Sequence, residues 1–215
     1  MTNDTDGPPV TATLPDSPIH TTGVDHITLI GSNEADTIAF YRDLLGMSLV
    51  LRQPNLDAPS VTHLFFDTGD GRLLSFFVNE DRTSQQTPQR PGIGAVHHLA
   101  FKLEPERFRD VMAALERADH PYNEFDRGVF HSLYTHDHNG LVIELSVDQY
   151  DFPEEKRGVV LAKAQQLRIE DGAEYATAEH LRAALEALDI PVEPYDLPEA
   201  PTGAGVDDDT TSGDG

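Results

Sequence analysis

The sequence contains two copies of one pattern of strands and helix, and an internal repeat restricts the possible folds more than any other feature. Residues 23–29 and 95–101 open the two copies, and both are short and rich in apolar and β-branched residues, as expected for strands. A helix is predicted after each, over 34–45 in the first copy and from Pro105 in the second, where apolar residues recur at helical spacing. The two halves of the chain are therefore expected to fold alike.

Three further strands are predicted after each helix. They cover 48–52, 62–66 and 73–78 in the first copy, and 122–125, 130–135 and 141–147 in the second. The last two strands of each copy are joined through a hairpin dipeptide, Asp70-Gly71 in the first and Asn139-Gly140 in the second. The predicted fold class is α+β, with two tandem β-α-β-β-β modules and an additional C-terminal helix.

The ends of the chain differ in composition from its middle. Residues 1–18 and 198–215 are polar and acidic, which predicts disordered tails. The part between them, 19–197, is expected to form one domain, and an amphipathic helix is predicted over 178–188. The domain is expected to have three segments: module 1 at about 22–80, module 2 at about 94–149 and a C-terminal helical extension at about 150–197.

Charge and composition exclude several classes of function. The chain has 38 Asp and Glu against 15 Lys and Arg, a formal net charge of −23, so nucleic acid is not expected as a partner. Only Lys102, Lys156 and Lys163 are lysines, which favours the protein of a salt-loving organism over an ordinary acidic protein. The absence of cysteine excludes disulfides and thiolate metal sites. No apolar run could span a membrane and no signal peptide is recognised, so a cytoplasmic location without a membrane partner is expected.

Aligning the two copies brings three residues of metal-binding type into comparable places. Superposing the hairpin glycines matches Ser75 with Glu144, which stands in an apolar strand, and the shared Val-x-His-hydrophobic pattern matches His26 with His98, with one small loop difference between the copies. A lone glutamate there would be interpreted as lying on a solvated face of the sheet. Together, two histidines and one carboxylate favour a metal site, because this donor set leaves three coordination positions open and suits Fe(II).

The same residues carry a family resemblance over roughly 22–147. The β-α-β-β-β repeat, with His26 and His98 on the first strands and Glu144 on the last, resembles the vicinal oxygen chelate superfamily, which includes glyoxalase I, bleomycin-resistance proteins and extradiol dioxygenases. The resemblance implies paired modules that curl into a cupped, barrel-like mixed sheet around a metal. The segments 40–47 and 63–66 further resemble ring-cleaving dioxygenases of the hydroquinone-dioxygenase branch.

That resemblance implies roles for seven residues. His26, His98 and Glu144 would bind Fe(II), with Mn(II) as the alternative metal. The remaining four match positions near the metal: Tyr134, His97 and Arg127 as catalytic residues, and Thr28 as a substrate-binding residue. Tyr134 or His97 would transfer protons, and Arg127 would stabilise negative charge or orient Tyr134. Strand alternation is expected to send His97 away from His98.

Three functions are therefore open. The first is an extradiol-type dioxygenase that uses a small aromatic substrate and O₂. The second is a glyoxalase-type lyase or epimerase, which would need a fourth ligand where this chain has Ser75. The third is a small-molecule binding protein without catalysis. Typical members of the dioxygenase branch carry four modules, and this chain has two. Paired modules can close a site within one chain or across two, so a homodimer is also left open.

Two other histidine-containing segments are given simpler interpretations. His136-Asp137-His138 resembles a metal cluster, but it precedes the turn at Asn139 and is predicted to be a solvated hairpin tip. His63 is expected to lie on a strand near the rim of the pocket.

Overall fold

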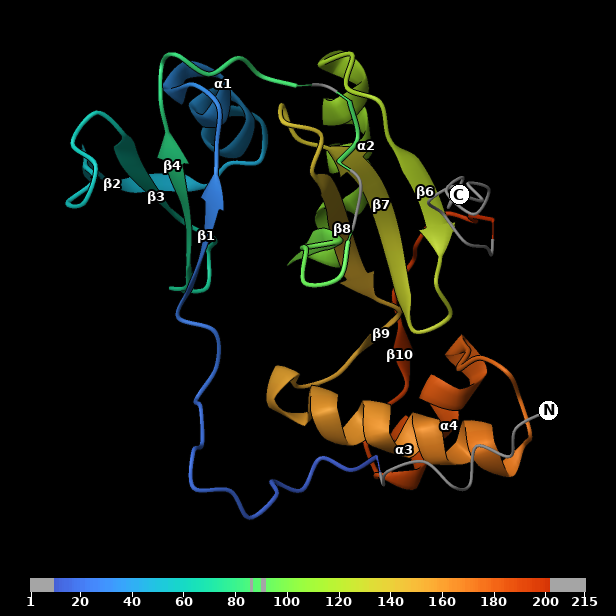
Figure 1. Ribbon diagram of the computed structural model, residues 1–215. Coiled ribbons are helices and arrows are strands. Elements are labelled where there is room, and N and C mark those ends of the chain that lie inside the picture. Colours follow the sequence, from blue (N-terminus) through green and yellow to red (C-terminus); the bar gives the residue numbers. More distant parts are fainter. Residues whose placement is uncertain (1–9, 86, 90–91, 202–215) are drawn as a thin grey trace, which may run out of the picture. The chain divides into compact units, whose positions relative to one another are not determined.

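The computed structural model describes residues 10–85, 87–89 and 92–201, which form two compact units (Figure 1). The first-module unit contains residues 17–101 and 135–143, and the extension unit contains the described residues of 10–16, 102–134 and 144–201. Half of the predicted N-terminal tail, residues 1–9, and most of the predicted C-terminal tail, residues 202–215, lie outside the described residues.

The first module forms a four-stranded mixed sheet with the order β1-β4-β3-β2. Its strands are β1 (His26–Ile30), β2 (Ser48–Pro54), β3 (Thr62–Asp67) and β4 (Leu73–Val78). β1 pairs with β4 in parallel, and the other neighbours are antiparallel, with a bulge in β2. All four predicted strands are confirmed, and so is the hairpin at Gly71, which adopts a positive φ of 81°.

One helical segment covers one face of this sheet. It consists of α1 (Glu34–Ile38) and a π-helical continuation, Ala39–Leu44, and it begins at Asn33, whose side chain accepts a hydrogen bond from the backbone N–H of Asp36. Its Tyr41 is fully buried, with its ring centroid 4.5 Å from that of Phe76. The apolar core beneath it is supplied by β3 and β4: Leu64, Phe66, Leu74, Phe76 and Val78.

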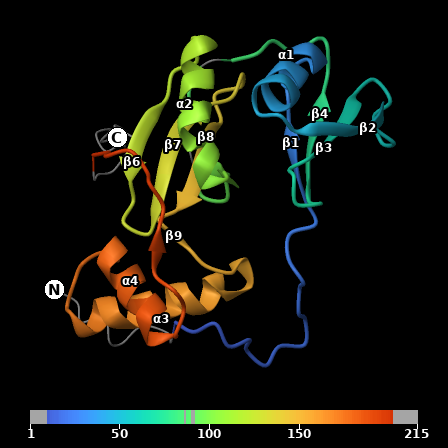
Figure 2. The same cartoon turned by 180° about the vertical axis from the view of Figure 1, so that it is seen from behind.

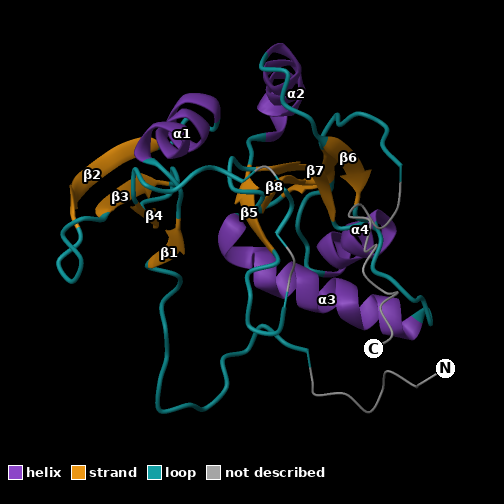
Figure 3. Cartoon of the chain, turned by 45° about the horizontal axis from the view of Figure 1, so that its top comes forward, coloured by secondary structure: helices purple, strands orange, loops and turns teal. Residues whose placement is uncertain are grey.

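The second module repeats this architecture, with the sheet order β5-β8-β7-β6. Its strands are β5 (His98–Lys102), β6 (Asn123–Asp126), β7 (Phe130–His136) and β8 (Val142–Asp148). A single 3₁₀ turn, Pro105–Arg107, leads into α2 (Phe108–Arg117), the purple helix at the top of Figure 3. Phe108 of α2 is buried and meets the ring of His131 edge-on. The predicted β-α-β-β-β repeat and α+β class are therefore confirmed.

The hairpin between β7 and β8 belongs to the first-module unit, although both strands belong to the second sheet. Its tip is not solvated, so that prediction is wrong. Asp137 is buried and accepts a 2.8 Å hydrogen bond from the hydroxyl of Tyr41, while His138 Nε2 lies 3.0 Å from Thr37 Oγ1. Gly140 is needed at this turn, because a Cβ would lie 2.1 Å from the carbonyl oxygen of Thr87.

Residues 150–194 form a small helical layer with its own core. Two helices pack side by side, α3 (Arg157–Glu170) and α4 (Ala178–Ala187) (Figure 2). The 3₁₀ turn Glu154–Lys156 leads into α3. A short strand pair is formed by β9 (Tyr150–Asp151) and β10 (Glu193–Pro194). The core is made of Val160, Ala164, Leu181, Ala184, Leu185 and Ile190. The sequence predicted α4 and not α3. None of the described helices is long and apolar enough to cross a membrane.

Candidate metal centre

Glu144 is the buried carboxylate of the predicted site. It lies in the middle of β8 with 6% of its surface exposed, so the interpretation that it points to a solvated face is wrong. Ser132, on the neighbouring strand β7 and fully buried, donates a 2.7 Å hydrogen bond to Glu144 Oε1. A carboxylate in an apolar sheet needs such donors, because burying it without partners is strongly unfavourable.

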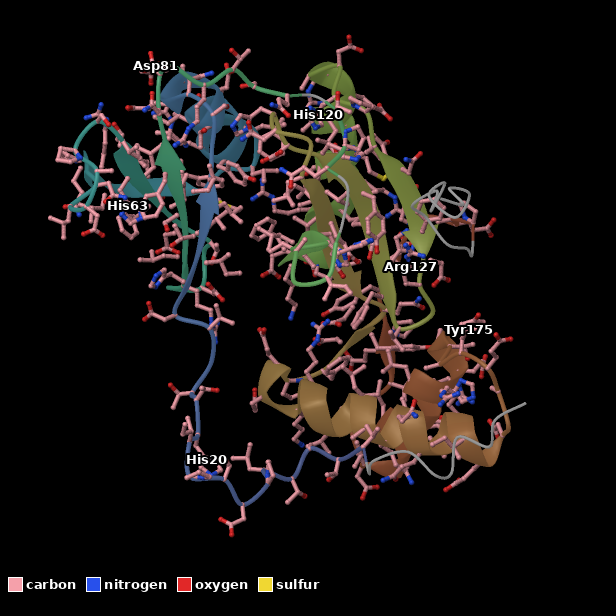
Figure 4. The ribbon with its side chains drawn as sticks, viewed as in Figure 1. His20, His63, Asp81, His120, Arg127 and Tyr175 are labelled. Carbon is pink, nitrogen blue, oxygen red and sulfur yellow. The ribbon has the colours of Figure 1, made fainter. Side chains whose placement is uncertain are left out.

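Tyr134 and Arg127 extend this polar cluster. Arg127, which is labelled in Figure 4, donates a 3.2 Å hydrogen bond from Nε to the hydroxyl oxygen of Tyr134. Its guanidinium carbon lies 4.8 Å from the centre of the Tyr134 ring. Burial raises the pKa of Tyr134, and its hydrogen bond to Glu144 and the charge of that carboxylate raise it further, against the opposing effect of Arg127. Tyr134 is therefore protonated at neutral pH and can donate a proton or a hydrogen bond.

The extension unit thus brings together three of the seven predicted residues, Arg127, Tyr134 and Glu144. The pairing of β6 with β7 places Tyr134 and Ser132 on one side of the sheet, because Tyr134 lies opposite Asn123 and Ser132 lies opposite Phe125. The sequence analysis did not identify Ser132. The available signal was its position two residues before Tyr134, which places both on the same face of a strand.

His98 and His97 contact each other directly. Their Nδ1 atoms are 2.8 Å apart, and their rings meet edge-to-face. The expectation that strand alternation separates them is wrong, because β5 begins at His98 and His97 lies just before the strand. A hydrogen bond at Nδ1 fixes the orientation of a histidine ring and directs Nε2 toward a metal.

His26 is held in a similar way in the first module. The residue before it, Asp25, places its carboxylate 2.5 Å from His26 Nδ1. Thr28 lies two residues further along β1, on the same face as His26, and its hydroxyl is 2.7 Å from that of Ser75 on β4. Asp25 and Ser75 were not predicted as site residues. In both modules, the residue before the candidate ligand histidine therefore contacts its Nδ1.

His63, which is labelled in Figure 4, lies on β3. The strand register places it on the same face of the first sheet as Thr28 and Ser75. Its ring lies between two aromatic rings, with centroids 3.9 Å from Phe65 and 4.4 Å from Phe77. Its Nε2 is buried and makes no hydrogen bond to the described residues. Burial, followed by electrostatic repulsion from His26, lowers the pKa of His63.

Comparison with known proteins identifies the family. The model of the Glyoxalase/Bleomycin resistance protein/Dioxygenase superfamily matches residues 23–145, more than half of the chain. The chain belongs to this superfamily. The predicted vicinal oxygen chelate resemblance is confirmed, and the family match covers both modules and all three candidate ligands. No match was found among curated proteins.

Solved structures of the superfamily share the fold at low sequence identity. A proposed dioxygenase from Bacillus subtilis subsp. subtilis str. 168 aligns with a TM-score of 0.52 and 24% identity over 62% of this chain, which covers 45% of that protein. A glyoxalase/dioxygenase from Nostoc punctiforme aligns with a TM-score of 0.50 and 19% identity over 64% of this chain and 99% of that one. This chain therefore spans under half of the Bacillus protein and nearly all of the Nostoc protein.

The side chains of this glyoxalase/dioxygenase superfamily member fit a divalent cation by donor type. The donor set consists of two imidazoles, from His26 and His98, and the carboxylate of Glu144. Each imidazole is contacted at Nδ1, and the carboxylate is buried and accepts hydrogen bonds. His26 and His98 belong to the first-module unit, and Glu144 belongs to the extension unit. Across residues 10–85, 87–89 and 92–201, no three His, Asp or Glu side chains are grouped to hold a metal ion.

A separate pocket of about 430 Å³ lies in the extension unit. Asp126 and His131 line it together with Gln149, Tyr150 and residues of the segment 194–200. Asp126 and His131 are paired on β6 and β7 and alternate with Phe125 and Ser132, so the pocket lies on the opposite side of the sheet from Ser132 and Tyr134. The lining described for this pocket includes none of the seven predicted site residues.

Proposed function

We propose that this superfamily member is a non-haem Fe(II)-dependent, extradiol-type dioxygenase that cleaves the ring of a dihydroxylated aromatic, a hydroquinone or a catechol, with O₂. The proposal depends on one observation above all: the sequence retains two histidines and a glutamate at equivalent places of the repeat, and that glutamate is buried and hydrogen-bonded. Such a donor set leaves room for both a chelating substrate and O₂ on one metal ion.

In this proposal, His26, His98 and Glu144 hold the metal. Fe(II), or Mn(II) in its place, supplies the path for electrons between the aromatic diol and O₂. The protein supplies the orientation of the histidine ligands: Asp25 acts on His26, and His97 acts on His98. The two histidines are exposed, which leaves them accessible to a small molecule.

Tyr134 is the proposed proton donor. Its pKa is raised by burial and by Glu144, so it carries its proton at neutral pH and can give it to an oxygen on which negative charge develops. Arg127, which donates to the Tyr134 hydroxyl oxygen, would stabilise the phenolate that remains. Thr28 would contact the substrate from the first sheet, where its hydroxyl is already paired with Ser75.

A glyoxalase-type lyase or epimerase is the second candidate, and it is less consistent with the chain. That chemistry would use a further carboxylate at the place of Ser75, whose hydroxyl is instead fully buried against Thr28. A binding protein without catalysis would not need a protonated tyrosine between an arginine and the metal carboxylate.

The test is an anaerobic reconstitution with Fe(II), followed by O₂-uptake measurements with hydroquinones and catechols. The proposal predicts O₂ consumption together with a ring-opened product that contains oxygen from ¹⁸O₂. Tyr134→Phe should lower kcat and change KM little, because it removes the proton and keeps the ring. Metal binding without O₂ uptake on any dihydroxylated aromatic would overturn the dioxygenase, and turnover of a glyoxalase-type substrate would replace it with the lyase or epimerase.

A further inference from the structure

The bond between Ser132 and Glu144 is a polar contact that the proposed chemistry does not require by itself. Ser132 is fully buried, and its neighbours along β7, Leu133 and Tyr134, are also buried. Its Oγ lies 2.7 Å from Glu144 Oε1, which is the length of a strong hydrogen bond from a hydroxyl to a carboxylate. The hydrogen-bond partner of this buried serine is therefore the candidate metal carboxylate.

The first module shows what the repeat contains without this pair. The shift that superposes Gly71 on Gly140 also superposes Ser75 on Glu144 and His63 on Ser132. The first sheet has no carboxylate at the position of Glu144 and no hydroxyl at the position of Ser132: Ser75 bonds to Thr28, and His63 packs between two phenylalanine rings. The carboxylate and its donor therefore occur together in the second module and are both absent at the corresponding positions of the first.

The geometry points to Ser132 as a positioning residue that holds Glu144 in the orientation needed for metal binding, an inference that depends on the proposed function. Glutamate has three side-chain torsions, and a fixed hydrogen bond to Oε1 restricts the rotation of its carboxylate before the metal arrives. Donors behind a ligating carboxylate commonly change metal affinity by about 10–100-fold. Tyr134 also hydrogen-bonds to Glu144, but it belongs to the proposed proton-transfer machinery, whereas Ser132 has no other assigned role.

The test measures the Kd of the anaerobic apoprotein for Mn(II) and for Fe(II), so that the readout is independent of activity. Ser132→Ala should weaken binding of both metals by about 10–100-fold. Ser132→Thr and Ser132→Val have nearly the same shape and differ in the hydroxyl, so only the threonine variant should bind metal nearly as tightly as the wild type. The matched control is Ser32→Ala, which removes a buried hydroxyl 2.9 Å from that of Ser84 and should leave the Kd within about twofold.

Urea unfolding of each apoprotein separates positioning from packing. If Ser132→Ala is less stable but binds metal as tightly as the wild type, Ser132 only fills space and the inference is wrong. Equal losses of affinity in the threonine and valine variants would also overturn it, because the hydroxyl would then be irrelevant. If the wild type itself binds neither metal, the proposed function fails and the inference fails with it, and this outcome is distinguished by the wild-type titration alone.

Discussion

Removing one hydroxyl from the core of the first module should destabilise the protein measurably. Tyr41 is fully buried, and its hydroxyl donates a 2.8 Å hydrogen bond to Asp137 Oδ2 at the tip of the β7–β8 hairpin. Tyr41→Phe removes this donor and leaves the ring in place. The other oxygen of Asp137 keeps its bonds from the backbone N–H groups of Asn139 and Leu141, so the hairpin turn itself should survive.

The magnitude follows from the burial of the acceptor. A hydrogen bond to a charged group contributes about 1.5–3 kcal/mol, and a buried carboxylate oxygen that loses its donor is not compensated by water. Asp137 is 5% exposed, so Tyr41→Phe should lower the free energy of unfolding by about 2 kcal/mol. The raised pKa of Tyr41, caused first by burial and then by Asp137, keeps the hydroxyl protonated as donor across neutral pH.

Urea unfolding measures this loss, and the chain offers a matched control. Tyr195 donates a hydrogen bond of the same length, 2.8 Å, to Asp151 Oδ1, but that pair is exposed. Tyr195→Phe should therefore change stability by no more than about 0.5 kcal/mol. If the two substitutions have equal and small effects, the hairpin tip is not buried against the first module, and the reasoning is refuted.

Three further perturbations test other parts of the structure. Burial and His26 lower the pKa of His63 from 6.5, so the folded protein binds fewer protons there than the unfolded chain, and stability should fall as the pH falls from about 7 to about 5. Chemical unfolding curves should show a smaller fall for His63→Phe, and a steeper fall would contradict the assignment. Thr177 begins α4 by capping its first turn, so Thr177→Ala should lower the free energy of unfolding by about 1 kcal/mol while Thr177→Ser should not, and equal stabilities would show that the cap is unimportant. Because the net charge is −23, the melting temperature should be higher in about 2 M than in about 0.1 M KCl, and an unchanged or lower value would count against a salt-adapted protein.

The order of the structural elements was predictable because its signals are local. Gly71 and Gly140 mark the two hairpins, and apolar alternation on either side of them predicts the strands that β3, β4, β7 and β8 confirm. The helix α3 gave a weaker signal, since three of its buried residues are Val160, Ala162 and Ala164, and alanines do not form a strong apolar stripe. The local pattern therefore predicted the modules better than the extension.

Burial was less predictable, because it depends on contacts between distant segments. The segment 136–138 has the composition of a solvated turn, and only its contacts with Thr37 and Tyr41, about a hundred residues earlier, bury it. The end of a strand is similarly uncertain from sequence: β5 begins at His98 and not at residue 95, which frees His97 from strand alternation and lets the two rings meet.

For the candidate site, the sequence predicted the residue types, and the contacts between them came from the structure. The resemblance to the superfamily supplied the residue types, and the structure adds the hydrogen bonds that link Arg127, Tyr134 and Glu144. Ser132 and Asp25 were missed because their roles depend on partners that the sequence does not show; spacing alone placed Ser132 on the face of Tyr134 without indicating its bond to Glu144. The roles of His26, His98 and Glu144 as metal ligands remain predictions.

The metal content of the anaerobically purified protein is the most direct test of those predictions. The account predicts about one iron or manganese ion per chain, lost in a His98→Ala variant that folds normally, as expected for an open site of three protein ligands. Zinc or nickel in its place would favour a lyase or epimerase. No bound metal, even after reconstitution with Fe(II) and Mn(II), would contradict the metal centre and leave a small-molecule binding protein.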